Sequence, residues 1–433
     1  MEINESLYAS PAYKRSRRAY ALECAFEYFV RLLVTEAFLA KLLGSMGISD
    51  AMIGIISSFI SLAFLFQLFS IFIVQRISNT KRFVVIFHEL SHLFFMLLYL
   101  IPFMPFAEGF RMPLAVICIL AAYFGNYFVT SMIFNWGNSH VHPRHRAEYS
   151  SVKEMISLAG GSIMTLVLGF IMDSFEAVDN LAGGFLFAAI AICIFAVCDL
   201  VCLLLIKNDI RPKTKRERVP MREVMGATFG NRNFVKIVIL TALWNTAQYM
   251  TVGFLGTYRV NPHELNFSVT AVQIITLVGS MAHFFSAKPI GRYSDKTSYA
   301  KGVKLGVLAA AIGFLCCMLT TPSTKYLIVA YTFFYGVASA ATGQNLLNIT
   351  YSYVDSKYYV QATAIKNSIG GLCGFVASLL ASMLLSHVQE SGNMLFGIPV
   401  YGQQVLAAIS LILCVVTVLF IRVFLQKQKT LVQ

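Results

Sequence analysis

The chain has 433 residues, of which 57% are apolar and only 13% are charged, and its formal net charge is +13. A water-soluble domain of this length needs far more charge to cover its surface, so this composition and a mean hydropathy of +0.69 exclude a soluble protein. No soluble basic domain remains to carry the positive charge, and we therefore expect no nucleic-acid partner.

Apolar segments long enough to cross a membrane recur along the whole chain. A bilayer core of about 30 Å needs roughly 20 apolar residues per helix. The apolar runs are continuous and do not alternate with polar residues, which favours helices over the strands of a membrane barrel. We therefore predict an all-α membrane protein with twelve transmembrane helices. They cover about 20–43, 50–74, 83–104, 113–136, 151–172, 182–206, 234–257, 268–290, 302–320, 326–352, 361–386 and 401–425.

Lysine and arginine concentrate on one side of these spans, and this asymmetry predicts the orientation. With the N-terminus inside, the outward turns hold only Lys41, Arg111, Arg259 and Lys325 as basic residues. The gap at 207–233 is rich in arginine and lysine, so it is expected to be a cytoplasmic linker with room for a short surface helix. We predict that both termini are cytoplasmic, that the membrane is the plasma membrane, and that the basic residues contact anionic lipid.

The first predicted span carries charged residues at helical spacing. Glu23, Glu27 and Arg31 are each four residues apart, so they share one face, which must look into the protein because ionised groups are costly in hydrocarbon. One hypothesis is that Glu27 exchanges a proton and that Arg31 lowers its pKa whenever the two pair. Two alternatives stay open. The pair is a permanent ion pair that holds the helix in its bundle, or Arg31 binds a substrate carboxylate.

The third predicted span contains a complete H-E-x-x-H motif at residues 88–92. This spacing places His88 and His92 on one helical face, where they can bind zinc with Glu89 as a base between them. An intramembrane zinc protease is therefore an alternative function, with Asp199 as the best candidate for a third ligand. Asp199 lacks the glycine-flanked context of such sites, and those proteases do not have twelve spans in two halves. We expect no metal, no cofactor and no enzymatic activity, with the histidines hydrogen-bonded within their helix and Glu89 a candidate second proton carrier.

The seventh and tenth predicted spans carry amide and aromatic side chains. Amides hydrogen-bond hydroxyl groups and aromatic rings stack on C–H faces, which suits a neutral polyhydroxylated solute. The alternative is that these side chains join helices, as asparagine and glutamine commonly do in membranes. The candidate substrate-binding residues are Trp244, Asn245, Gln248, Tyr249, Gln344, Asn345 and Asn348.

A short polar segment joins the eighth and ninth spans, where residues 288–296 read K-P-I-G-R-Y-S-D-K. It resembles the Gly-x-x-x-Asp-Arg/Lys loop signature of the major facilitator superfamily. The equivalent segment after the second span, residues 75–82, lacks the glycine and the aspartate. The resemblance implies a cytoplasmic gate whose contacts break during transport, and the alternative is a solvated loop. The candidate gate residues are Gly291, Arg292, Asp295 and Lys296.

A second similarity links Gly160-Gly161 in the fifth span with Gly370-Gly371 in the eleventh. Together with the span count and the central linker, it extends the resemblance to the whole chain. The resemblance implies two pseudo-symmetric six-helix bundles, 1–206 and 234–433, joined by the linker 207–233. It also implies alternating access, in which the bundles rock about a central site.

These observations predict a secondary active transporter of a small organic solute. No nucleotide-binding loop is present, so energy is expected to come from an ion gradient. We expect H⁺ as the coupling ion, a sugar or sugar derivative as the substrate, symport as the mode, and a monomer as the working unit. A first alternative is an exporter of drugs or other amphipathic compounds. The fifth span contains no proline. This argues against the exporter alternative, because drug–proton antiporters of the superfamily that the chain resembles typically carry a Gly-Pro-rich stretch in this span.

Overall fold

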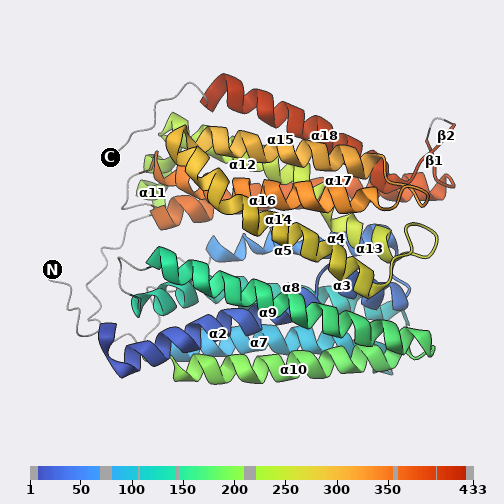
Figure 1. Ribbon diagram of the computed structural model, residues 1–433, viewed down its shortest axis with the longest axis horizontal. Coiled ribbons are helices and arrows are strands. Elements are labelled where there is room, and N and C mark those ends of the chain that lie inside the picture. Colours follow the sequence, from blue (N-terminus) through green and yellow to red (C-terminus); the bar gives the residue numbers. More distant parts are fainter. Residues whose placement is uncertain are drawn as a thin grey trace. The chain divides into compact units, whose positions relative to one another are not determined.

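The computed structural model describes residues 8–68, 80–105, 108–141, 146–208, 221–354, 359–395 and 397–425. Nearly all of these residues are helical, and the two short strands β1 (Met394–Leu395) and β2 (Ile398–Pro399) form one antiparallel hairpin. Figure 1 labels the helices in chain order. The predicted all-α fold class is confirmed.

The chain divides into two compact units, each described here by itself. Unit 1 contains residues 1–48 and 69–216, and unit 2 contains residues 49–68 and 217–433. The helices of unit 1 are α2 (Pro11–Leu33), α3 (Glu36–Ser45), α7 (Thr80–Leu100), η1 (Ile101–Phe103), α8 (Glu108–Ser139), α9 (Arg146–Ala177) and α10 (Leu181–Leu205). The helices of unit 2 are α4 (Asp50–Ser57), α5 (Phe59–Ala63), α11 (Met221–Phe229), α12 (Arg232–Tyr249), η3 (Val252–Phe254), α13 (Leu255–Val260), α14 (Val269–Lys296), α15 (Tyr299–Met318), α16 (Leu327–Tyr351), α17 (Tyr359–Glu390), α18 (Gly402–Phe420) and η5 (Ile421–Leu425).

Ten helical stretches in the described part of the chain are long and apolar enough to cross a membrane. Each overlaps one of ten predicted spans, often extending past its predicted ends, and helices α2 and α16 lie where the first and tenth spans are predicted. Helix α2 is less apolar because Glu23, Glu27 and Arg31 follow the basic residues of its first turns. The chain is therefore a multi-pass membrane protein.

Several predicted spans are interrupted rather than continuous. The first is divided at Val34–Thr35 between α2 and α3, and the seventh is divided at η3 between α12 and α13. The break at η3 brings the backbone of Gly253 close to α4, since a Cβ atom at this position would lie 2.7 Å from the carbonyl oxygen of Gly54. Glycine is therefore required at 253 for the two segments to approach so closely.

The same helix pairs pack in both units, as an internal duplication predicts. In unit 1, α2 packs against α9 and α10, and α7 packs against α8 and α10; in unit 2, α12 packs against α17 and α18, and α15 packs against α16 and α18. Glycines allow the close contacts. A Cβ atom would lie 2.6 Å from Phe29 at Gly160, and 2.5 Å from Asn245 at Gly370. The Gly-Gly similarity noted in the sequence therefore marks equivalent helix contacts.

The central linker contains a short helix, as expected. Helix α11 occupies Met221–Phe229, and residues 209–220 lie outside the described residues. The degenerate signature segment is also mostly outside them, because residues 69–79 are not described.

Candidate functional site

Charged and polar side chains from several helices meet inside unit 1. We call this group the unit 1 polar cluster. Its members come from α2, α7, α8 and α10, which are otherwise mostly apolar, so each must find a polar partner inside the bundle. The members are Glu23, Glu27, Arg31, His88, Glu89, His92, Asn126 and Asp199.

Glu27 is held by two polar partners. Its Oε1 atom lies 3.7 Å from Arg31 Nη1, one turn further along α2, and it accepts a hydrogen bond of 3.2 Å from Asn126 Nδ2 of α8. Thr130 Oγ1 donates to Asn126 Oδ1 at 3.1 Å, which orients the amide so that its nitrogen faces Glu27. The predicted Glu27–Arg31 pair is therefore present, and Asn126 is a partner that the sequence did not indicate.

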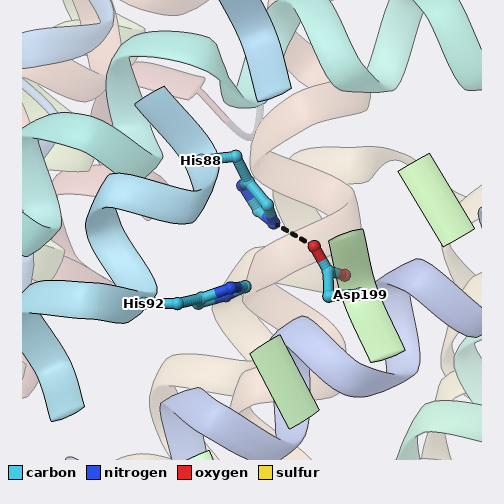
Figure 2. Close-up of side chains that lie close together, drawn as sticks. All are labelled: His88, His92 and Asp199. Carbon is cyan, nitrogen blue, oxygen red and sulfur yellow. Dashed lines mark ion pairs between the residues drawn. The ribbon is translucent and has the colours of Figure 1, made fainter. Parts of the chain in front are cut away.

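Glu23 belongs to a second group, centred on His88. The Nε2 atom of His88 lies 3.2 Å from Asp199 Oδ2 and 3.7 Å from Glu23 Oε1. All three side chains are buried, with Asp199 completely excluded from solvent. Figure 2 shows the His88 ring directed at Asp199, with His92 of the next helical turn beside it. The structure thus joins the H-E-x-x-H helix to α10 through an acid that lies far away in the sequence.

The polar side-chain atoms of the two histidines and of Asp199 lack hydrogen-bond partners among the described protein groups. The side-chain nitrogens of His88 and His92 and both carboxylate oxygens of Asp199 are buried and lack a hydrogen-bond partner of good geometry. The contact of His92 with Glu89 is an ion-pair distance of 3.6 Å between Nδ1 and Oε2. Buried polar atoms in this state are costly unless a proton, water or ion completes the group.

A small pocket with room for about one water molecule lies beside these residues within unit 1. An acid, a base, an imidazole, an amide and two phenols contribute to its lining, and most of the lining surface is apolar. The lining residues are Glu27, Val30, Arg31, His92, Phe95, Tyr123, Asn126 and Tyr127. Sequence reasoning had placed the polar lining in the second half of the chain only. Asn126 and the two tyrosines of α8 were missed because asparagine and tyrosine are common in membrane helices and carry no distinctive spacing.

The predicted substrate residues of helix α12 connect to helix α16 within unit 2. Gln248 Nε2 donates to Asn245 Oδ1 at 2.6 Å, and the hydroxyl of Tyr335 donates to Gln248 Oε1 at 3.0 Å. Trp244 is buried on the same helix, and the Tyr249 ring packs against Gly374 of α17. These side chains form a hydrogen-bonded group between helices, an arrangement compatible with either of the roles predicted for them.

The structure describes the side chains of two of the three predicted substrate residues of α16. Asn345 is buried, donates to the carbonyl oxygen of Ala341 at 2.7 Å and packs against Gly302 of α15. Asn348 is half-buried. The side chain of Gln344 lies outside the described residues. Asn345 therefore stabilises a contact between helices.

The predicted gate segment is helical, not a loop. Helix α14 continues through Gly291, Arg292 and Asp295 and ends at Lys296. Thr297 and Ser298 alone make the turn to α15, and Ser298 Oγ accepts a hydrogen bond from the backbone N–H of Lys301 at 3.2 Å, which begins the next helix. No atom lies within 4 Å of the position that a Cβ on Gly291 would occupy. Asp295 is exposed, and no ion pair within the described residues involves it.

A second buried acid lies outside the membrane-spanning segments, in the loop between α13 and α14. Glu264 Oε1 accepts a hydrogen bond of 2.9 Å from Gln403 Nε2, while its other oxygen is buried without a partner. Burial, and next the negative charge of Asp50, raise the pKa of Glu264 to about 8. The side chain is therefore expected to be protonated in the folded protein at neutral pH.

This shift predicts a pH-dependent stability. An unfolded glutamate titrates near its ordinary value of 4.5, whereas folded Glu264 keeps its proton to about pH 8. The folded state thus binds more protons within this window, and its stability falls as pH rises from about 4.5 to about 8.

The Glu264→Gln variant keeps a neutral side chain. Its melting temperature in detergent should exceed that of the wild type by a margin that grows across this window. Glu390→Gln, at the exposed end of α17, is the control. A margin that stays constant with pH would contradict the assignment.

Comparison with known proteins supplies the family. A family model described as "Major Facilitator Superfamily" matches residues 20–378 and 262–431. A curated relative, "Multidrug resistance protein MdtH" of Aeromonas hydrophila subsp. hydrophila, is 23% identical over 243 residues. That alignment covers 54% of this chain and 56% of the relative, so it spans little more than half of either protein.

Solved structures share the fold along almost the whole chain. A crystal structure of the nucleoside transporter NupG superposes with a TM-score of 0.73 at 13% identity, covering 94% of this chain and 100% of that one. The D-xylose-proton symporter superposes with a TM-score of 0.70 at 15% identity, covering 97% and 99%. A bacterial homologue of the human lysosomal transporter Spinster gives a TM-score of 0.68 at 14% identity, covering 95% and 96%. At these identities the likeness concerns the fold alone.

Proposed function

The chain belongs to the Major Facilitator Superfamily, and from that premise we propose that it is a proton-coupled secondary transporter of a small polar solute that works by alternating access. The family and the structural neighbours are transporters, so the chain is a transporter and not an enzyme, which removes the zinc-protease alternative. The proposal places the protein in the plasma membrane with both termini in the cytoplasm, as the distribution of lysine and arginine favours.

The observation that carries the proposal is the position of Glu27. Its side chain is 17% exposed, is paired with Arg31 and Asn126, and lines the unit 1 pocket, whereas the Arg31 side chain is 38% exposed. An ionised acid that is mostly buried among membrane helices is costly unless it has a role or a permanent partner. Because Arg31 also lines the pocket, a proton on Glu27 would release Arg31 to bind a polar group of the solute. Proton binding and solute binding would then depend on the same pair.

Glu23 takes a supporting part in this proposal. It lies one turn before Glu27 on α2 and contacts His88, which in turn contacts Asp199. A proton released by Glu27 therefore has titratable neighbours within the bundle. The chain of groups gives the proton a route that does not require an ionised side chain to stand alone.

A sugar, a sugar derivative or a nucleoside is the substrate class that we propose. The polar groups of the pocket are an amide, phenols and an imidazole, which hydrogen-bond hydroxyl groups. The Asn245–Gln248–Tyr335 group of unit 2 offers the same chemistry. Among proteins of the same fold, one is named a nucleoside transporter and another a D-xylose-proton symporter.

Export of amphipathic compounds is the second candidate. It is favoured by the relative named as a multidrug resistance protein, which aligns with just over half of the chain. The charged and amide groups of the pocket lining, Glu27, Arg31 and Asn126, favour a hydrophilic solute instead.

A ligand screen distinguishes these candidates. Sugars, nucleosides, amino acids and amphipathic drugs are tested for their effect on the melting temperature of detergent-purified protein. We expect a rise with a sugar or nucleoside, because a ligand that binds only the folded state stabilises it. The hit is then measured in proteoliposomes, where an inward proton gradient should drive its accumulation. Stabilisation by drugs alone, or uptake indifferent to the proton gradient, would contradict the proposal.

A further inference from the structure

The H-E-x-x-H helix has no catalytic role in a transporter, yet its two histidines meet a carboxylate in the fold. His88 and His92 lie on one face of α7, with their ring centres 4.8 Å apart, and Asp199 faces them from α10 (Figure 2). One ligand atom from each of the three side chains lies within 4.8 Å of the others. All three residues are at most 2% exposed.

The distances fit two ligands of one small ion. Zn–N and Zn–O bonds are about 2.0–2.2 Å long, so two ligands in a tetrahedron are about 3.4 Å apart. The 3.2 Å separation of His88 Nε2 and Asp199 Oδ2 matches that spacing. His92 offers a third ligand atom within 4.8 Å of those of His88 and Asp199, so it must approach further to bind the same ion.

The unsatisfied atoms indicate that something belongs between these side chains. Both nitrogens of each histidine and both oxygens of Asp199 are buried without a hydrogen-bond partner of good geometry. Each such atom costs about 1–3 kcal/mol when nothing replaces its hydration. A single cation at the centre would satisfy one atom of each residue at once.

The charges of the surrounding groups favour a divalent cation. Glu23 Oε1 lies 3.7 Å from His88 Nε2, outside the group of three, where its charge faces the site. The carboxylates of Asp199, Glu23 and Glu89 surround two neutral imidazoles, so a dication would offset most of the negative charge buried there. Glu89 Oε2 lies 3.6 Å from His92 Nδ1, where it can accept that N–H and direct Nε2 to the metal, as outer carboxylates do in zinc sites.

We propose that His88, His92 and Asp199 bind one divalent transition-metal ion of the zinc class inside unit 1. Mixed nitrogen and oxygen ligands in small number suit zinc or cobalt, whereas magnesium and calcium prefer more oxygen ligands. The site lies beside the Glu27–Arg31 pair, because His92 also lines the pocket that Glu27 and Arg31 line. It shares Glu23, His88 and Asp199 with the proton route proposed above, so a bound ion would take the place of that route. Metal binding itself requires no transport activity.

The test is metal binding to the intact, detergent-purified chain after treatment with a chelator. Zinc is added, excess metal is removed, and bound zinc is measured by elemental analysis and titration calorimetry. We expect one equivalent per chain in the wild type. The His88→Ala, His92→Ala and Asp199→Asn variants should each bind at least about tenfold more weakly. The control is His387→Ala, which removes an exposed histidine of α17 and should bind as the wild type does.

Two further measurements keep the outcome clear if a variant folds poorly. Cobalt in place of zinc should give the visible absorption of a tetrahedral site in the wild type and in His387→Ala. Glu89→Gln, which leaves every ligand in place, should weaken zinc binding by about 10-fold to 100-fold. Three results would each overturn the proposal. The wild type binds no zinc, magnesium binds as tightly as zinc, or a His88→Ala variant that elutes as a folded monomer binds zinc as fully as the wild type does. These assays use no transport substrate, so their failure leaves the proposed function untouched.

Discussion

Replacing Glu27 with glutamine is expected to abolish proton-driven accumulation of the substrate and to leave substrate exchange intact. Glutamine keeps the size of the side chain and can still accept a hydrogen bond from Asn126, which donates to Glu27 in the wild type. It cannot gain or lose a proton, so the step that couples solute movement to the gradient is lost. Exchange needs no net proton movement, because the carrier crosses in both directions with solute bound.

The measurement compares two fluxes of the solute found in the ligand screen. Accumulation is driven by an imposed pH gradient in proteoliposomes, and exchange is driven by unlabelled solute on the opposite side. The expected loss of accumulation is at least about 100-fold, the lower end of the range for removing one proton-transfer group. Glu390→Gln, an exposed acid at the end of α17, is the matched control. Survival of both fluxes rules out the proton role, whereas loss of both indicates that the Glu27–Arg31 pair is structural.

Replacing Gly336 with alanine is expected to destabilise unit 2 severely. A Cβ atom at residue 336 of α16 would collide with the carbonyl oxygen of Gly279 on α14, and backbone cannot move aside as a flexible side chain can. The two helices would have to separate along their contact. Overpacking of this kind costs about 1–3 kcal/mol and more where backbone must shift. The yield of monodisperse protein and its melting temperature should therefore both fall.

Gly343 provides the matched control, because it lies on the same helix two turns further along. No atom lies within 4 Å of the position that its Cβ would occupy. Alanine there should raise the melting temperature slightly, since glycine in a helix interior is about 0.5–1 kcal/mol worse than alanine. Equal effects of the two substitutions would show that α14 and α16 do not approach as closely as the structure has them.

The number and positions of the helices were largely predictable from composition. Apolar runs of the required length are dictated by the thickness of the bilayer, and the described helices fall on them. The breaks at Val34–Thr35 and at η3 were not predictable. Neither break contains a proline, and the second coincides with the close approach of Gly253 to Gly54, a contact between distant parts of the chain.

In the gate segment the sequence suggested an interruption where the structure has a continuous helix. Its polar residues suggested a loop because polarity and loops usually coincide at the end of a membrane span. Nothing in residues 291–296 opposes a helix, however, so α14 continues into the aqueous layer until Thr297. Polarity indicated where the membrane ends, and the helix itself ends several residues later.

Part of the candidate site was predictable from the spacing of residues along one helix. Glu23, Glu27 and Arg31 share a helical face by their spacing alone, and the Glu27–Arg31 ion pair follows from it. Asp199 carried a signal too, since it is an acid within the otherwise apolar helix α10. Its meeting with His88 depends on the packing of α7 against α10, which spacing along either helix cannot reveal.

The sequence alone determined that this is a membrane protein. It also determined how the helices are spaced along the chain and which helical face of the first span is polar. These properties depend on distances of a few residues and on transfer from water to hydrocarbon, both of which are local. Only the tertiary structure decided which buried charges meet. Glu23, His88 and Asp199 come from three helices, and their contacts arise because an ionised or polar group excluded from lipid must find its partner on whichever neighbour the packing supplies.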